Sequence, residues 1–233
     1  MSKVQWKGGT FIYPIPAVMV SCGTMEESNI ITVAWTGILN TNPAMCYISV
    51  RPERYSHNII KENGEFAINL TTRQLAYATD WCGVKSGRDV DKFKEMKLTK
   101  ERANIIKAPL IKECPVSVEC KVKEIVPLGS HDMFVAEIVA IDADEKYIDE
   151  KGAFDIGKCD LIAYANGGYY PLESKIGKFG YNLDIQYRKR VKLLKIQRLM
   201  QKERRIKLNK WLRKKSPTQW IGLFLARMLS VNT

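Results

Sequence analysis

The clearest alternation of hydrophobic and polar residues lies in Pro115–Val126, where Val116, Val118, Cys120 and Val122 alternate with Ser117, Glu119, Lys121 and Lys123. This period places apolar side chains on one face of a strand and polar side chains on the other. A turn-forming run, Pro127–Ser130, separates it from a second apolar stretch, Phe134–Ile141. The two stretches are therefore predicted to pair as a long antiparallel hairpin.

Shorter apolar runs bounded by turn residues fill the first part of the chain. Strands are predicted over Phe11–Ser21, Ile30–Ala34, Ala44–Val50 and Glu65–Leu70, with a turn over Cys22–Ser28. Two prolines near the start of the first run suit a strand that begins at a sheet edge or bend.

Short helices are predicted between these strands. They cover Arg54–Glu62, which ends at the left-handed stop Asn63-Gly64, then Arg73–Trp81, with Thr72 as its cap, and Lys92–Met96. No amphipathic helix of 10–15 residues recurs between strands, so a doubly wound parallel sheet is disfavoured. The expected fold is mainly β with short helices, an antiparallel barrel whose ends the helices cover.

Composition excludes a disordered protein, because 45% of the 233 residues are hydrophobic. The formal charge of +12 first indicates a nucleic-acid or membrane partner, but it is unevenly placed. Residues 1–185 carry 22 Lys and Arg against 24 Asp and Glu, whereas residues 186–233 carry 15 against one. We therefore expect one domain over residues 1–185 and a basic C-terminal extension, helical or disordered, over residues 186–233.

Several kinds of chemistry find no support in the sequence. The first residues show neither the continuous apolar stretch of a secretory signal nor its small-residue cleavage site, so the protein is predicted to be cytoplasmic. Six cysteines without C-x-x-C spacing indicate free, mostly buried thiols. With only His57 and His131 available, no metal site is predicted. Cys46 or Cys82 could approach a histidine in space, but a buried inert thiol is the better interpretation, so no catalytic nucleophile is assigned.

Five ordered blocks carry a specific resemblance. They are Ser28–Trp35, Ile48–Ser56, Phe66–Asn69, Ser86–Phe93 and Gly129–Phe134. In order, spacing and chemistry they resemble the flavin reductase-like family, and within it the flavoredoxin branch, over roughly residues 7–181.

The resemblance implies a split β-barrel that binds FMN non-covalently, as a homodimer with each flavin near the subunit interface. It also implies an FMN-dependent oxidoreductase or electron carrier, with NAD(P)H or a redox protein partner as the electron donor. The chain shows no phosphate-binding loop and no separate nicotinamide-binding domain, so NAD(P)H would have to meet the flavin directly.

The second block supplies candidates for the phosphate and ribityl contacts. The residues implied are Ser49, Val50, Arg51, Pro52, Arg54 and Ser56. Two arginines on either side of a proline can aim guanidinium groups at phosphate oxygens from a fixed turn. The alternative is an ordinary strand-to-helix turn with solvated arginines.

The first block supplies Asn29, Thr32, Ala34 and Trp35, which the resemblance places beside the flavin. The indole of Trp35 offers a flat wall with one N–H donor. A core aromatic is an equally good interpretation of that residue from sequence alone.

The loop block supplies Ser86, Gly87 and Lys92. Loop amides and a hydroxyl would face the cofactor. The Lys92 ammonium is expected beside N1/C2=O of the flavin, where it would raise the reduction potential. The alternative is a solvated lysine among acidic neighbours.

Two further positions come from the resemblance. His131 lies before a strand, where it would approach the isoalloxazine; the alternative is a turn histidine satisfied by backbone. Tyr164 matches an aromatic position near the ring, with Tyr169 and Tyr170 as close competitors.

The basic extension allows three interpretations. Arg188–Lys215 is rich in helix formers without one apolar stripe, and Thr218–Leu229 is apolar but too short to span a bilayer. Contact with an anionic membrane surface or with nucleic acid would make the chain a non-enzymatic binding module, the alternative to an oxidoreductase. The third interpretation is unselected sequence from about Ile185 onward, produced by a shifted reading frame.

Overall fold

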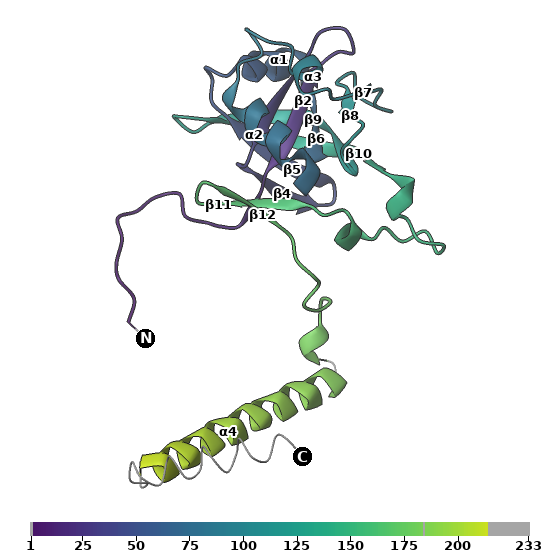
Figure 1. The fold of residues 1–233 in the computed structure, drawn as a ribbon. Helices are drawn as coiled ribbons and strands as arrows, with labels where there is room; N and C mark the ends of the chain where they lie inside the picture. The colour runs from purple at the N-terminus through teal and green to yellow at the C-terminus, as the bar shows by residue number, and fades with distance from the viewer. Residues whose placement is uncertain (1, 184, 214–233) are drawn as a thin grey trace, which may run out of the picture. The chain divides into compact units, whose positions relative to one another are not determined.

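The computed structural model describes residues 2–183 and 185–213 (Figure 1). The chain divides into two units, Met1–Ser174 and Lys175–Thr233, each described by itself below. The domain boundary expected at residue 185 remains a prediction.

Seven antiparallel strands form the main sheet of the first unit, in the order β3-β2-β6-β9-β10-β5-β4. The strands are β2 (Val18–Gly23), β3 (Ser28–Val33), β4 (Thr36–Thr41), β5 (Ala44–Val50), β6 (Glu65–Leu70), β9 (Val116–Pro127) and β10 (Asp132–Ala143). The long hairpin predicted from the alternating pattern is β9–β10, so this prediction and the mainly antiparallel fold class are confirmed.

Two small sheets, several short helices and one long helix complete the described chain. The strands are β1 (Ile15–Pro16), β11 (Ile162–Ala165) and β12 (Gly168–Pro171) in one sheet, and β7 (Lys100–Glu101) and β8 (Leu110–Ile111) in the other. The α-helices are α1 (Tyr55–Asn63), α2 (Ala76–Val84), α3 (Lys92–Glu95) and α4 (Ile185–Arg213). The 3-10 turns are η1 (Arg73–Leu75), η2 (Glu145–Tyr147), η3 (Ile156–Lys158) and η4 (Tyr181–Leu183). Figure 1 shows α1 and α3 at one end of the barrel and the β11–β12 hairpin at the other.

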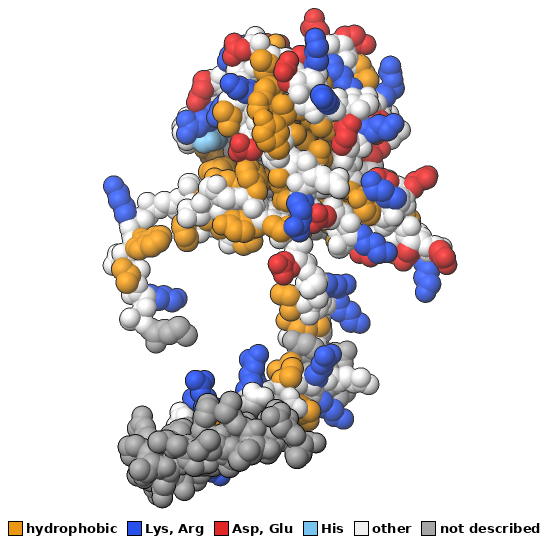
Figure 2. Space-filling model, in the orientation of Figure 1, with side chains coloured by type: hydrophobic (Ala, Val, Ile, Leu, Met, Phe, Trp, Pro, Cys, Tyr) orange, Lys and Arg blue, Asp and Glu red, His pale blue; other side chains and the backbone are white. Residues whose placement is uncertain are grey.

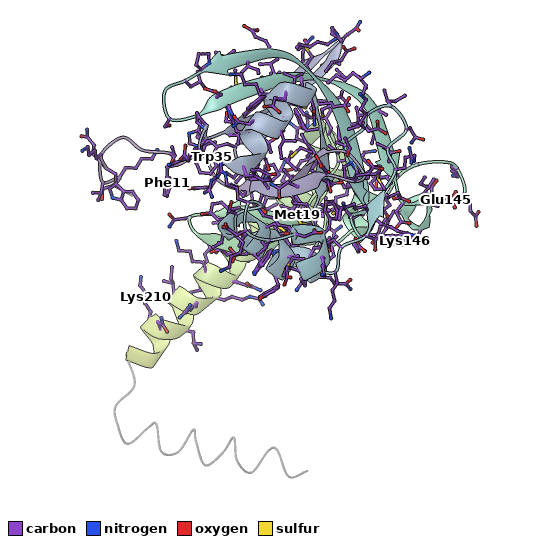
Figure 3. The ribbon with its side chains drawn as sticks, turned by 90° about the horizontal axis from the view of Figure 1, so that it is seen from above. Phe11, Met19, Trp35, Glu145, Lys146 and Lys210 are labelled. Carbon is purple, nitrogen blue, oxygen red and sulfur yellow. The ribbon has the colours of Figure 1, made fainter. Side chains whose placement is uncertain are left out.

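Successive residues of β2 face two different cores, because side chains alternate along a strand. Val20 packs inside the barrel with Phe66 and Phe134, whereas Met19 packs beneath the helices with Phe93. Met19 lies within the body of the fold in Figure 3. All six cysteines are buried and free, as predicted.

The sequence-based predictions were wrong at three places. The strand expected over Phe11–Ser21 starts only at Ile15, breaks after Pro16 and continues through Gly23, because the prolines lack the N–H that a ladder needs. Strand β4 was missed because it is an edge strand whose apolar Ile38 is 82% exposed, so it shows no buried face. The helix expected over Arg73–Trp81 begins as the 3-10 turn η1, and Thr72 makes no capping hydrogen bond through its side chain.

The second unit contains helix α4, which holds twelve Lys and Arg and one acidic residue, Glu203. No helix in the described residues is long and apolar enough to cross a membrane. The predicted apolar segment Thr218–Leu229 lies outside the described residues.

Candidate functional site

Two adjoining hollows of about 310 and 340 Å³ lie along one side of the barrel. Ile31, Arg54 and Gly83 line both hollows, so the two form one depression. Its combined size falls within the range of small-molecule and cofactor sites.

We name the first the basic hollow. It is lined by Asn29, Ile31, Glu53, Arg54, Tyr55, Ser56, Cys82, Gly83, Lys85, Ser86, Gly87, Arg88 and Lys92. Four of these side chains are cationic and only Glu53 is a carboxylate, so the hollow attracts anions.

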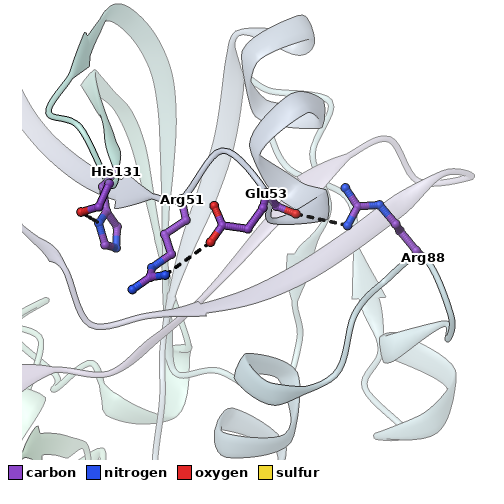
Figure 4. Close-up of polar contacts among 5 residues, drawn as sticks. Arg51, Glu53, Arg88 and His131 are labelled. Carbon is purple, nitrogen blue, oxygen red and sulfur yellow. Dashed lines mark hydrogen bonds and ion pairs between the residues drawn. The ribbon is translucent and has the colours of Figure 1, made fainter.

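The turn between β5 and α1 positions two of the cationic groups. Arg54 occupies the N-cap position of α1 in extended backbone, so its side chain lies where the helix begins. The Arg88 guanidinium donates to the Glu53 carbonyl oxygen at 3.2 Å (Figure 4). It also lies 5.5 Å from the centre of the Tyr55 ring. Loop and turn are therefore held together at the rim of the basic hollow.

Asn29, Ser56 and Gly87 form a close-packed floor. The Asn29 amide donates to the Ser56 hydroxyl at 2.8 Å, and both side chains are buried. A Cβ added at Gly87 would lie 2.1 Å from Asn29 Oδ1, which no real contact permits. Glycine is therefore required for the loop to approach Asn29 this closely.

Lys92 is buried, with 4% of its surface exposed, so the solvated-lysine interpretation is wrong. Its ammonium donates to the carbonyl oxygens of Ile30 and Cys82, both at 2.7 Å. Burial lowers the Lys92 pKa to about 8. Lys92 lines the basic hollow and not the second one, so its expected place beside N1/C2=O remains a prediction.

We name the second the aromatic hollow. It is lined by Ala17, Ile31, Thr32, Val33, Ala34, Trp35, Ser49, Val50, Arg51, Arg54, Asp80, Gly83, Val84, His131, Tyr164 and Tyr169. Trp35 is 41% exposed, so the interpretation of this residue as a core aromatic is wrong. Its ring stacks parallel to the His131 imidazole, with centroids 6.2 Å apart. Figure 3 places Trp35 and Phe11 on the same side of the barrel.

The polar edge of the aromatic hollow contains His131 and Arg51. His131 Nδ1 lies 2.9 Å from the Ser130 hydroxyl. The partner of this ring nitrogen is therefore a side chain, whereas the alternative interpretation expected a backbone group. Desolvation, with a smaller contribution from Arg51, lowers the pKa of His131, which favours the neutral imidazole at neutral pH. The Arg51 guanidinium pairs with the Glu53 carboxylate at 3.4 Å (Figure 4).

The β11–β12 hairpin supplies the aromatic side chains on another edge. Tyr164 and Tyr169 both line the hollow, and their rings meet edge to face at 5.6 Å between centroids. Tyr170 is 56% exposed and does not line the hollow. The Tyr169 hydroxyl donates to Asp80 Oδ1 at 3.0 Å, and burial together with this bond raises the Tyr169 pKa to about 12.

Every predicted site residue except Pro52 lines one of the hollows. Pro52 lies within the turn that the Arg54 amide closes on the Arg51 carbonyl oxygen at 3.0 Å. Asp80 and Gly83 were not predicted as site residues, because they belong to α2 and show no local pattern. Arg88 was not predicted either, although it belongs to a recognised block.

The cysteines near the site are not arranged for nucleophilic chemistry. Burial raises the pKa of the Cys82 thiol to about 11. The Cys46 sulfur lies 3.5 Å from that of Cys120. Within residues 2–183 and 185–213, neither Cys46 nor Cys82 makes a hydrogen bond to a histidine.

The described barrel is therefore antiparallel and carries one depression with an anion-attracting end and an aromatic end. Residues 10–173 match the model of the flavin reductase like domain, and the chain therefore belongs to the flavin reductase-like family.

Known structures agree with this assignment. The chain is similar to the flavoredoxin of Desulfovibrio vulgaris (Miyazaki F), at a TM-score of 0.71 and 29% identity over 76% of this chain and 97% of that one. It is also similar to the flavoredoxin of Methanosarcina acetivorans, at a TM-score of 0.70 and 29% identity over 79% of this chain and all of that one. These matches support the flavoredoxin branch.

Two further similarities are more distant. An FMN-binding protein of Thermus thermophilus shares the fold, at a TM-score of 0.64 and 24% identity over 76% of this chain and all of that one. A curated relative, the NADPH-flavin oxidoreductase of Streptomyces viridifaciens, is 26% identical over 138 residues, 58% of this chain and 70% of that protein. The split β-barrel and a flavin-related redox role at the level of the family are thus established.

Proposed function

We propose that the chain binds FMN non-covalently and acts as an FMN-dependent oxidoreductase. The observation that carries this proposal is the division of one depression into an end with four cations and an end with aromatic walls. FMN has the same polarity, with a phosphate at one end and an isoalloxazine at the other. Bound FMN would supply the redox chemistry itself.

The residues present fit the cofactor. Arg54 offers a charged donor to a phosphate, and Ser56 and Ser86 offer hydroxyls beside it. At the other end, the half-exposed Trp35 offers a flat apolar wall that shields a ring from water. The depression can therefore bind and orient both parts of the molecule at once.

A charge-removal pair tests the binding. Arg54→Gln is expected to weaken FMN binding about 10- to 150-fold, because one charge-assisted hydrogen bond is worth about 1.5–3 kcal/mol. Arg102→Gln removes the same charge from an exposed position outside both hollows and should leave the Kd unchanged. The measurement is quenching of FMN fluorescence by the full chain. A wild-type protein that causes no quenching would end the proposal.

The electron donor follows as a separate proposal. We expect NADH or NADPH to approach the half-exposed side of the aromatic hollow near Trp35, and the similarity to an NADPH-flavin oxidoreductase supports this reductase role. The similarity to flavoredoxins favours a protein donor instead. Anaerobic stopped-flow reduction of the bound flavin separates the two, since failure with both nucleotides leaves the protein donor.

We propose a homodimer for the first unit. Large apolar side chains on the N-terminal segment and on edge strand β4 are exposed, namely Trp6, Phe11, Ile12, Ile38 and Leu39, and Figure 2 shows hydrophobic side chains along the N-terminal segment. Such exposed apolar surface is typical of an association site. Light scattering should give twice the chain mass of 26.6 kDa; a monomer at every concentration would refute it.

We also propose that the protein acts in the cytoplasm. Six free cysteines support this, because such thiols are kept reduced there. Cell fractionation of the native protein tests the proposal, and recovery from an extracytoplasmic fraction would contradict it.

A second proposed function concerns α4, which we expect to bind nucleic acid. Its cations are distributed around the helix and its apolar residues form no single stripe, whereas a helix lying on a membrane needs one apolar face. A basic helix of this kind suits a groove with phosphates on both sides. Anisotropy of a labelled duplex should show binding that weakens steeply between 50 and 200 mM salt. Binding to anionic vesicles without binding to the duplex would favour the membrane instead.

A further inference from the structure

We infer that Asp80 and Tyr169 form a latch that holds the β11–β12 hairpin against α2 and thereby positions Tyr164 as a wall of the aromatic hollow. The inference rests on the proposed function, because the wall matters only when a flavin ring lies in the hollow. The two residues are positioning residues, and neither takes part in electron transfer.

The hairpin needs such a link because it lies outside the main sheet. It pairs with β1 in a three-stranded sheet, whereas the strands that carry most of the hollow belong to the seven-stranded one. Its first strand is held at the open end, where the Ile162 amide donates to the Thr71 carbonyl oxygen at 3.1 Å. Its far end is a tight turn with Asn166 and Gly167 in left-handed backbone.

The hydrogen bond between Tyr169 and Asp80 supplies the missing link. It joins residues 89 positions apart with a hydroxyl–carboxylate separation of 3.0 Å. In the part of the chain that the structure describes, it is the one side-chain hydrogen bond between this hairpin and α2. Because the Tyr169 pKa is raised, the hydroxyl keeps its proton and donates throughout the neutral range.

The latch reaches Tyr164 through ring packing. Tyr164 and Tyr169 are directly paired across the hairpin and meet edge to face, and Tyr13 packs edge to face on the other side of Tyr164 at 6.1 Å. If Tyr169 loses its hydrogen bond to Asp80, its ring is free to shift, and the ring of Tyr164 then loses a fixed packing partner. The wall that a flavin ring would contact then becomes adjustable, and binding weakens.

Five variants of the full chain test the latch. Tyr169→Phe and Asp80→Ala each remove the bond, and each should raise the FMN Kd about 3- to 10-fold. The double variant should bind no more weakly than either single one, because both remove the same interaction. Asp80→Asn keeps an acceptor oxygen and should stay within twofold of wild type. Tyr170→Phe is the matched control, since this exposed hydroxyl is on the same hairpin but outside the hollow.

Two readouts separate positioning from general stability. The visible circular dichroism of bound FMN should change in Tyr169→Phe and Asp80→Ala and remain as in wild type in Asp80→Asn and Tyr170→Phe. Without FMN, amide hydrogen exchange across residues 162–171 should accelerate in Tyr169→Phe, in Asp80→Ala and in the double variant, and should stay as in wild type in Asp80→Asn and Tyr170→Phe.

The outcomes are distinguishable. Unchanged Kd and dichroism in Tyr169→Phe and Asp80→Ala, with a wild type that binds FMN, would overturn the latch and leave the proposed function intact. Additive losses in the double variant would also overturn it. Accelerated exchange in the hairpin of a chain whose wild type binds no FMN would support the latch while refuting the proposed function.

Discussion

Replacing Gly87 by alanine perturbs the basic hollow at its tightest point. The new Cβ would lie 2.1 Å from Oδ1, 2.5 Å from Cγ and 2.8 Å from Nδ2 of Asn29. Asn29 is buried and holds Ser56 through its amide, so it cannot swing into solvent without losing that bond. The exposed loop has more freedom, and we expect it to move outward and withdraw Ser86 and Arg88 from the hollow.

The cost follows from this geometry. Forcing one methyl group into a packed site typically costs about 1–3 kcal/mol, including about 1 kcal/mol if the hydrogen bond between Asn29 and Ser56 is lost. If the FMN-binding conformation bears this cost, the Kd rises about 5- to 150-fold. Fluorescence quenching measures the Kd, and urea unfolding measures stability separately. Gly8→Ala is the control, since its Cβ would meet nothing within 4 Å. A Kd for Gly87→Ala within twofold of wild type would refute this account of the loop.

Three further predictions concern Lys92, Glu119 and the tail. Burial lowers the Lys92 pKa from its usual 10.5 to about 8, so between these values Lys92 binds more protons in the unfolded chain. Its contribution to the unfolding free energy should therefore rise by about 3 kcal/mol from pH 8 to 10.5, against the loss caused by buried thiols such as Cys82. The measurement is the difference between wild type and Lys92→Met in urea titrations, which should grow with pH over this range; a constant difference would contradict it. The buried Glu119 carboxylate accepts hydrogen bonds from three backbone N–H groups at 2.7–2.9 Å, so Glu119→Gln should lower the free energy of unfolding by about 2–4 kcal/mol. Glu124→Gln, at an exposed position, should change it by less than about 0.5 kcal/mol. Equal effects of the two substitutions in urea titrations would contradict a stabilising role for Glu119. Truncation after Ser174 should leave the FMN Kd unchanged, and a large loss of binding would show that the second unit contributes to the site.

Local sequence patterns predicted many of the strands, because the alternation of side chains along a strand depends only on residues that are neighbours in the sequence. The alternation of apolar and polar residues predicted strand β9, and the predicted bounds of β5 and β6 agree with the structure. It did not predict that the polar Ser117 and Glu119 of β9 are buried as well. Strand β4 was not predicted, because it is an edge strand whose apolar residues Ile38 and Leu39 are exposed and form no alternating pattern.

Part of the candidate site could be predicted from the sequence, and part of it depends on contacts between distant segments. The resemblance assigned residues such as Arg54 and His131 because they belong to ordered blocks, and the structure brings them to one depression. It gave no information on Asp80, whose role depends on Tyr169 arriving from a distant hairpin. Nor could it separate a solvated Lys92 from a buried one, because two carbonyl oxygens from different elements decide that.

The sequence by itself determined the strand periodicity, the family and the placement of the basic charge in the last 48 residues. Each of these depends on the order of residues along the chain. Only the tertiary structure decided that Trp35 is half-exposed, that Lys92 is buried and that the cationic and aromatic hollows adjoin. These properties depend on which segments pack together, and packing between residues tens of positions apart leaves no local pattern in the sequence.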